Sequence, residues 1–263
     1  MSTSPPPTPK PRRRWLQFSV RTLLVLMLVL GCGFGWLAYE IKMVREQREA
    51  VTAIETLGGS VYWKPASGGM IRTAVAWVGK FLGEDLSVDV RVVYLKNSPV
   101  TDAGLEHLRG LTQLQYLSLD STHVTDAGLE HLRGLTQLQW LRLDSTRVTD
   151  AGLEHLRGLT QLEGLSLNST QVTGAGLKHL RRLTQLEGLS LDSSPVTDVG
   201  LERLRGLTQL QGLYLNSTQV TDAGLEHLRG LTQLQELSLH STQVTDAGVN
   251  DLQKALSNVK VTR

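Results

Sequence analysis

The stretch Val-Thr-Asp-Ala-Gly-Leu-Glu-His-Leu-Arg-Gly-Leu-Thr-Gln-Leu at residues 124–138 decides the fold, because near-copies of it recur along the chain. Its threonine falls at seven positions, each 24 residues after the one before: Thr101, Thr125, Thr149, Thr173, Thr197, Thr221 and Thr245. A constant period of this kind predicts a solenoid, in which like units stack and each buries the apolar face of its neighbour.

Within one unit the apolar pattern changes its period. Leu117-Ser118-Leu119 alternates apolar and polar, as a half-buried strand does, whereas Leu129, Leu132 and Leu135 are spaced as on a helix. We therefore predict an α/β solenoid of strand-turn-helix units, with strands on a concave face and helices on the convex one. With the end strand at Val259 and Val261, the units give about eight strands.

Thr-Asp-Ala-Gly stands between strand and helix in most units. Either Thr101 or Asp102 can cap its helix, and the aspartate also complements the helix dipole, so we interpret the recurrent aspartate as structural. Gly174 replaces it in one unit, where we predict a weaker cap.

The pattern Leu-x-x-Leu-x-x-Leu-x-Leu-x-x-Thr-x-Val-Thr-Asp-x-Gly-Leu-x-x-Leu over residues 91–263 resembles the cysteine-containing subclass of leucine-rich repeats, best known from F-box substrate receptors. The resemblance implies a horseshoe that binds ligands through its concave face. Thr122 and its equivalents stand where that subclass usually has Asn or Cys, and no F-box precedes the repeats, which argues against a ubiquitin-ligase role. Phe18-Ser19-Val20-Arg21-Thr22-Leu23-Leu24, followed by an apolar run and a Leu-Gly-Gly unit, also resembles the start of bacterial single-pass, membrane-anchored repeat proteins.

The N-terminal region reads as a membrane anchor. Residues 1–17 form a flexible basic tail, and residues 18–39 are apolar apart from Arg21, long enough for a transmembrane helix of about 20 residues. Five Lys or Arg flank the N-terminal side and three flank the other. The positive-inside rule then places the tail in the cytoplasm and the repeats on the extracytoplasmic side of the cell membrane.

Two alternatives to a retained anchor stay open. Val29-Leu30-Gly31-Cys32 resembles a bacterial lipobox, whose cysteine is lipidated, and the segment also fits a cleaved signal peptide. Gly31 and Gly35 form a Gly-x-x-x-Gly pair through which two helices could dimerise.

Between anchor and repeats, residues 40–57 have helical spacing and are predicted to form a juxtamembrane helix that ends at Gly58-Gly59. Residues 58–87, with a short strand at 61–63 and an amphipathic helix at 70–82, are expected to cap the open end of the solenoid. The repeat domain occupies residues 88–263.

Several functions are disfavoured by composition. A net charge of +2 gives no electrostatic case for a nucleic-acid partner, and Cys32 as the single cysteine allows neither an internal disulfide nor a cysteine metal cluster. The histidine ladder is interpreted as a solvated convex surface, not a metal site: His107, His131, His155, His179 and His227. No catalytic constellation is present, so we expect a protein that is not an enzyme and has no cofactor.

Positions that vary between near-identical units indicate where function lies. Strand positions on the concave face differ from unit to unit, including a column that runs Lys96, Asp120, Asp144, Asn168, Asp192, Asn216 and His240. Tyr, Trp and Arg are the typical anchors of interfaces. The predicted ligand-binding residues are therefore Tyr94, Tyr116, Trp140, Arg142, Arg147 and Tyr214.

We interpret the chain as a membrane-tethered protein that binds a protein or glycan ligand. The alternatives are a structural, self-associating envelope protein, an intracellular adaptor if the topology is inverted, and neutral drift at the variable positions.

Overall fold

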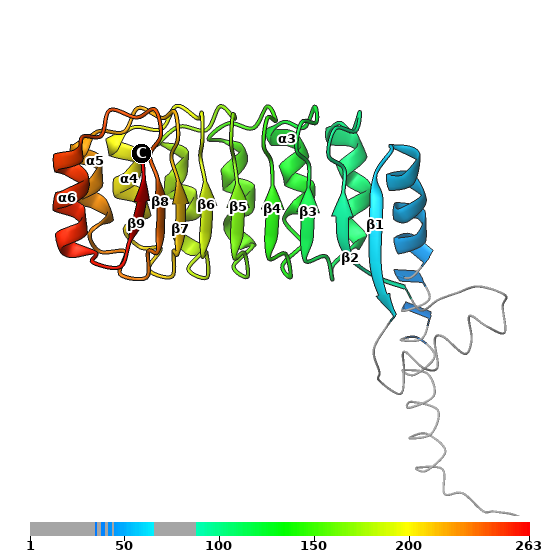
Figure 1. Ribbon diagram of the computed structural model, residues 1–263. Coiled ribbons are helices and arrows are strands. Elements are labelled where there is room, and N and C mark those ends of the chain that lie inside the picture. Colours follow the sequence, from blue (N-terminus) through cyan, green and yellow to red (C-terminus); the bar gives the residue numbers. More distant parts are fainter. Residues whose placement is uncertain (1–34, 36–37, 40–41, 44, 66–87) are drawn as a thin grey trace, which may run out of the picture.

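Parallel strands 24 residues apart in sequence form one sheet that runs the length of the repeats (Figure 1). The structure, a computed structural model, describes residues 35, 38–39, 42–43, 45–65 and 88–263. In this part of the chain nine strands form one sheet in sequential order, with β1 antiparallel to β2 and all later pairs parallel. The strands are β1 (Ser60–Pro65), β2 (Val88–Tyr94), β3 (Tyr116–Ser118), β4 (Trp140–Arg142), β5 (Gly164–Ser166), β6 (Gly188–Ser190), β7 (Gly212–Tyr214), β8 (Glu236–Ser238) and β9 (Lys260–Thr262).

The core is a set of leucine stacks that run the length of the solenoid. Leu117 pairs with Leu141, and Leu141 with Leu165, so the repeat period places the same side chain directly above its equivalent. The repeat leucines are almost completely buried in one continuous cluster. The predicted solenoid with about eight parallel strands is confirmed, since β2 to β9 are eight.

The convex segments are less helical than predicted. Within the described repeats, residues 88–263, only α6 (Asp246–Ala255) is a full α-helix, and three units have one α-helical turn that continues as a 3-10 helix. A 3-10 helix is narrower than an α-helix, whose diameter of about 10 Å exceeds the ~4.8 Å between strands, so it lets neighbouring units stack closely. The remaining elements are η1 (Asp102–Gly110), α3 (Asp126–Leu129), η2 (Glu130–Leu132), η3 (Gly152–Gly158), η4 (Gly176–Arg182), α4 (Asp198–Leu201), η5 (Glu202–Leu204), α5 (Asp222–Leu225) and η6 (Glu226–Leu228).

Two polar residues, in most units a serine and a threonine, turn the chain after each of the strands β2 to β8. Ser121 has a φ of 56°, in the left-handed region, and its equivalents share this conformation. Thr122 is buried, and its hydroxyl donates to the carbonyl of Leu119 at 2.7 Å. The threonine therefore satisfies a carbonyl inside its own unit, which accounts for Thr at the position where the resembled subclass has Asn or Cys.

The recurrent aspartate joins neighbouring units instead of capping its own helix. Asp126 accepts hydrogen bonds from the backbone N–H and the hydroxyl of Thr149 in the next unit, at 2.8 and 2.6 Å. Thr125, not the aspartate, caps α3 by accepting from the N–H of Ala127. The pKa of Asp222 is lowered because the hydroxyl and then the N–H of Thr245 donate to it. Of the two residues predicted as caps, the threonine caps α3, and the structural role of the aspartate is confirmed with Thr149 of the next unit as its partner.

Asp126→Ala is expected to lower the free energy of unfolding by about 2 to 3 kcal/mol, because a carboxylate that accepts two hydrogen bonds is removed. Asp126→Asn, which keeps one acceptor oxygen, should cost less. Urea unfolding of both variants measures the difference, and equal losses for the two would contradict the role of the second hydrogen bond.

Gly174 interrupts this ladder. The weaker cap predicted in the unit of Gly174 is not found, since the hydroxyl of Thr173 accepts from the N–H of Ala175 at 3.1 Å. The effect falls on the following unit, where among the described residues no aspartate bonds Thr197 and Thr197 makes no side-chain cap bond. A Cβ at Gly174 would overlap the backbone of Gly200, which shows that the two units approach closely there. With glycine at this position, the two units lack the hydrogen bonds of the aspartate and instead pack backbone against backbone.

The first repeat is covered by a helix and a strand. Residues 45–56 are helical, and Ala50 and Ile54 lie in the common core. The helix ends as predicted: Gly58 has a φ of 77°, and Gly59 donates to the carbonyl of Ile54 at 2.9 Å. β1 then pairs with β2. The helix at 45–56 and β1 together cover the first repeat, a role that was predicted for residues 58–87 alone.

Most of 18–39, including Gly31 and Cys32, and the helix expected at 70–82 lie outside the described residues. None of the helices within the described ranges combines the length and apolar character needed to cross a membrane.

Candidate ligand-binding face

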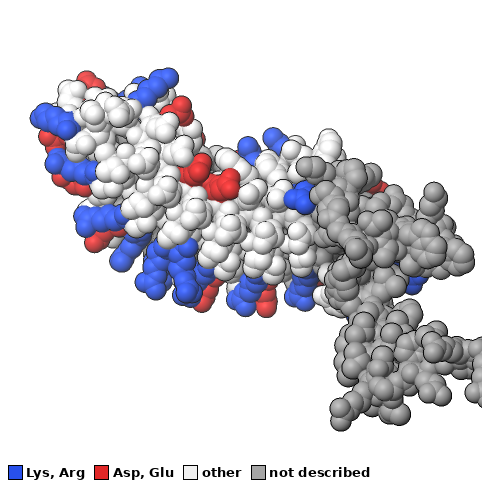
Figure 2. Space-filling model, turned by 90° about the horizontal axis from the view of Figure 1, so that it is seen from below, with Lys and Arg blue, Asp and Glu red and all other residues white. Residues whose placement is uncertain are grey.

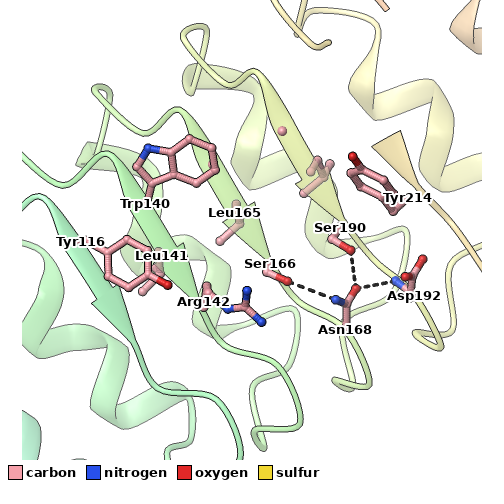
Figure 3. A pocket seen from close by; sticks show the side chains of 13 residues that line it. Tyr116, Trp140, Leu141, Arg142, Leu165, Ser166, Asn168, Ser190, Asp192 and Tyr214 are labelled. Atoms are coloured by element: carbon pink, nitrogen blue, oxygen red, sulfur yellow. Dashed lines mark hydrogen bonds between the residues drawn. The ribbon is translucent and has the colours of Figure 1, made fainter. Parts of the chain in front are cut away.

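A cavity of about 360 Å³ lies in the middle of the concave face, between Trp140 and Tyr214 (Figure 3). Trp140 begins β4 and Tyr214 ends β7, so the cavity spans the two strands between them. Gly164 and Gly188 line it at positions where the first repeats have Tyr116 and Trp140. Because Gly164 and Gly188 have no side chains, two consecutive strands leave open the space that lies between the aromatic rings.

Trp140 lies over its neighbour in the next strand. A Cβ at Gly164 would overlap the six-membered ring of the indole, so only glycine allows this ring position. Trp140 remains 45% exposed, so a large apolar residue is left in contact with water. The tryptophan is thus held in place by the sheet and available to a ligand.

Tyr214 forms the opposite wall. Its ring packs beside Gly212, and its hydroxyl donates to Glu236 at 2.8 Å. This hydrogen bond, with burial, raises the pKa of Tyr214 and keeps the phenol neutral. The ring is therefore fixed at both its body and its tip.

The lower edge of the cavity is polar, and its polar groups also hold the units together. The Oδ1 atom of Asn168 accepts from the hydroxyl of Ser190 at 2.6 Å and the N–H of Asp192 at 2.8 Å (Figure 3). The carboxylate of Asp192 accepts in turn from the N–H of Asn216 at 2.7 Å. These residues belong to the column from Lys96 to His240, which was predicted as variable concave surface. From Asp120 to Asn216, each side chain of the column instead accepts a hydrogen bond from the backbone of the next unit, so this part of the column is structural.

Arg142 is tied to this ladder. Its Nε donates to Asp120 at 2.8 Å and its Nη2 to Asp144 at 2.9 Å. Burial alone would lower the pKa of Arg142, but the two carboxylates outweigh it and raise the pKa. The guanidinium is consequently a positioned, permanently charged group on the cavity wall.

A row of tyrosines continues the aromatic surface toward β1. The rings of Tyr94 and Tyr116 lie 5.0 Å apart, and Tyr62 meets Tyr94 edge-on at 5.7 Å. Burial raises the pKa of Tyr116, so its hydroxyl stays protonated. The concave face thus carries an aromatic strip that leads into the cavity.

The structure brings most of the predicted binding residues together. Tyr116, Trp140, Arg142 and Tyr214 line the cavity, and Tyr94 contacts Tyr116. Arg147 lies on an exposed turn and is not among the cavity-lining residues.

Sequence reasoning missed Tyr62 and the role of Gly164 and Gly188. The run of glycines in one strand column was the available signal for the cavity.

The arrangement supports non-covalent binding. In the described part of the chain no group of three or more His, Cys, Asp or Glu is placed to hold a metal ion. Three histidines of the ladder, His131, His155 and His227, instead bond to arginines of the preceding unit, as in the 2.9 Å bond from Arg109 to Nδ1 of His131. The groups of the cavity are those that stack on and hydrogen-bond a ligand.

Comparison with known proteins gives the family and the fold. Residues 87–262 match the model of the leucine-rich repeat region. No curated protein matches the sequence.

Among solved structures, internalin C2 of Listeria monocytogenes is 25% identical, with a TM-score of 0.50 over 70% of this chain and 90% of that chain. Internalin F of the same species is 21% identical, with a TM-score of 0.39 over 64% of this chain and 65% of that one. The structure of PEPR1–AtPEP1 is matched at 20% identity and a TM-score of 0.46, over 66% of this chain and 24% of that one.

Proposed function

Because this chain belongs to the leucine-rich repeat family, we propose that it is a binding protein that holds another protein on the concave face of its sheet. The observation that carries the proposal is the cavity between Trp140 and Tyr214, enclosed by aromatic rings over a floor that includes glycine. Its volume of about 360 Å³ is in the range of pockets that hold a ligand group.

The distribution of exposed apolar side chains supports the concave face. Tyr62, Tyr94 and Trp140 are among the large hydrophobic residues that the described chain leaves exposed, and all three belong to the strip along the sheet. Contiguous apolar surface of this kind on a folded domain marks an interaction site. A partner that covers the strip and inserts a side chain into the cavity would remove this surface from water.

The same cavity offers polar contacts that orient the partner. Arg142 presents a fixed guanidinium, and Asp192 a carboxylate without a salt bridge among the described residues. Preorganised groups lose little conformational entropy on binding. The partner's anchor is therefore expected to combine an apolar body with a polar or charged end.

We propose further that residues 18–39 tether the chain to a membrane, with the repeats on the extracytoplasmic side, as in bacterial single-pass repeat proteins. The apolar composition of that segment and the basic residues before it support this. A reporter enzyme fused after Arg263 tests the topology: activity only in the cytoplasm would exclude it. Acyl labelling that depends on Cys32 would favour the lipoprotein instead.

Photo-cross-linking in the native host tests the binding proposal. A photoreactive amino acid at position 188 points into the cavity, whereas the same group at position 230 lies on open convex surface. We expect one protein to be captured from position 188 and not from position 230. Capture of a second copy of this chain would instead support self-association, and equal capture at both positions would contradict the proposal.

Trp140→Ala is expected to weaken binding of the captured protein at least 30-fold, about 2 kcal/mol, as removal of a central aromatic anchor does. Tyr116→Ala should weaken it less, because Tyr116 lies at the edge of the cavity, one strand before Trp140. Isothermal titration with the purified partner measures both. Undiminished affinity in Trp140→Ala, with an unchanged unfolding midpoint, would remove the cavity from the interface.

A further inference from the structure

The convex face carries a second surface that the concave cavity does not use. Residues 173–182 contain three basic and no acidic residues, whereas the equivalent residues 125–134 contain two acidic residues and one basic. Lys178 stands where five other units have Glu, Arg182 where five have Gly, and Arg203 of the next unit where five have His. These changes fall on two adjacent units and all have the same sign.

The altered residues gather in space. Two hollows lie side by side on the 3-10 helices and share Arg157. One, of about 380 Å³, is lined also by Arg133, Arg182 and one acidic residue, Glu154. The other, of about 300 Å³, is lined also by Lys178, Arg181 and Arg203 and has no acidic residue in its lining. Seen from below, basic side chains gather on the helix side of the middle units, whereas basic and acidic side chains alternate toward the N-terminal units (Figure 2).

The local ion pairs do not neutralise this cluster. Lys178, Arg181, Arg182 and Arg203 are exposed, and among the described residues none of them forms a salt bridge. Arg157 meets Glu154 only at 3.6 Å. The ladder in which arginine donates to the histidine of the next unit is interrupted here, because Arg203 replaces the histidine that would face Arg181, and it resumes between Arg205 and His227.

Burial, followed by the charge of Lys178, lowers the pKa of His179, which sits in the same hollow. Like-charge crowding is unfavourable unless an anion relieves it. The positive charges of the cluster are therefore available for neutralisation by an anionic partner.

We propose that this basic cluster, defined as Arg133, Arg157, Lys178, Arg181, Arg182 and Arg203, binds a linear chain of phosphate groups. Arginine is its main component, and the planar guanidinium fork fits oxyanions. A phosphate has three acceptor oxygens and can take hydrogen bonds from several guanidinium groups at once. Two adjacent hollows with one shared arginine suit phosphates spaced along one chain, and neither is lined by Trp, Tyr or Phe on which nucleic-acid bases would stack.

The test uses the full chain and linear inorganic polyphosphate as the probe. The triple variant Lys178→Glu, Arg182→Gly, Arg203→His introduces the residues that five other units have at these positions, so we expect it to fold as the unaltered chain does. We expect its affinity for polyphosphate to fall about 10- to 100-fold in ~0.1 M salt and the salt dependence of binding to become shallower.

A matched control removes the same charge elsewhere: Lys254→Glu, Lys260→Gln, Arg263→Gln changes the last unit and is expected to bind polyphosphate as the unaltered chain does. An equal loss in both variants would reduce the effect to net charge and overturn the proposal. Polyglutamate and anionic vesicles are tested alongside, and tighter binding of either, lost in the triple variant, would assign the cluster to an acidic protein or a lipid surface instead.

Discussion

Leu143→Ala is expected to lower the free energy of unfolding by about 3 to 5 kcal/mol. Leu143 is completely buried, and Leu119 and Leu167 occupy the same position in the units on either side. Backbone hydrogen bonds hold the neighbouring units at fixed spacing, such as the 2.9 Å bond from Leu143 to Ser166. The cavity left by the shorter side chain therefore cannot close, and the loss includes contacts with both neighbours.

Urea unfolding followed by circular dichroism measures this loss, with Gln137→Ala as the control. Gln137 is exposed in the adjoining turn, and its replacement should change stability by less than about 0.5 kcal/mol. Because a solenoid transmits stability only between neighbours, a central leucine couples the two halves of the molecule. A loss below about 1 kcal/mol for Leu143→Ala would mean that the units unfold independently.

The architecture followed from the sequence because each of its determinants is repeated. One alternating triplet such as Leu117-Ser118-Leu119 is weak evidence for a strand, but its recurrence at a fixed period leaves stacking as the way to bury the leucines. The length of the convex helices did not follow. Leucines at helical spacing fit an α-helix and a 3-10 helix equally well over two turns, and the close stacking of units decides between them.

The aspartate ladder shows a second limit of local reasoning. Asp126 stands where a helix cap is expected, and sequence spacing alone assigns it to its own unit. The parallel stack places Thr149, 23 residues later, closer to the carboxylate. Partners of this kind are visible only once the register between units is known.

At the candidate site, the sequence predicts which residues are exposed on the concave face. It does not predict how their side chains are arranged around a cavity. Alternation along the strands is enough to place Tyr116, Trp140 and Tyr214 on the concave face. That the indole of Trp140 folds toward β5 depends on the missing side chain at Gly164. The cavity therefore arises from pairs of residues in different units, one with a large side chain and one, a glycine, with none.

Gly188→Tyr is expected to abolish binding to the concave face, with at least a 30-fold loss of affinity for the captured protein, while the fold is retained. No atom of the described chain lies within 4 Å of a Cβ at Gly188, so a side chain fits the strand without displacing its neighbours. The equivalent position holds Tyr116 in an earlier unit, so the sheet already accepts tyrosine there. Its ring would occupy the space between Trp140 and Tyr214 that the partner's side chain needs.

Gly230→Tyr is the matched control, because a Cβ there also meets no described atom within 4 Å but projects from the convex side. Stability should stay equal or rise by up to about 1 kcal/mol in Gly188→Tyr, since glycine inside a strand is entropically costly. Lost binding with retained stability separates occupation of the cavity from damage to the fold, a distinction that Trp140→Ala alone does not make. If Gly188→Tyr binds the partner as tightly as Gly230→Tyr does, the partner does not enter the cavity, and the tyrosine strip from Tyr62 to Tyr116 becomes the surface to mutate next.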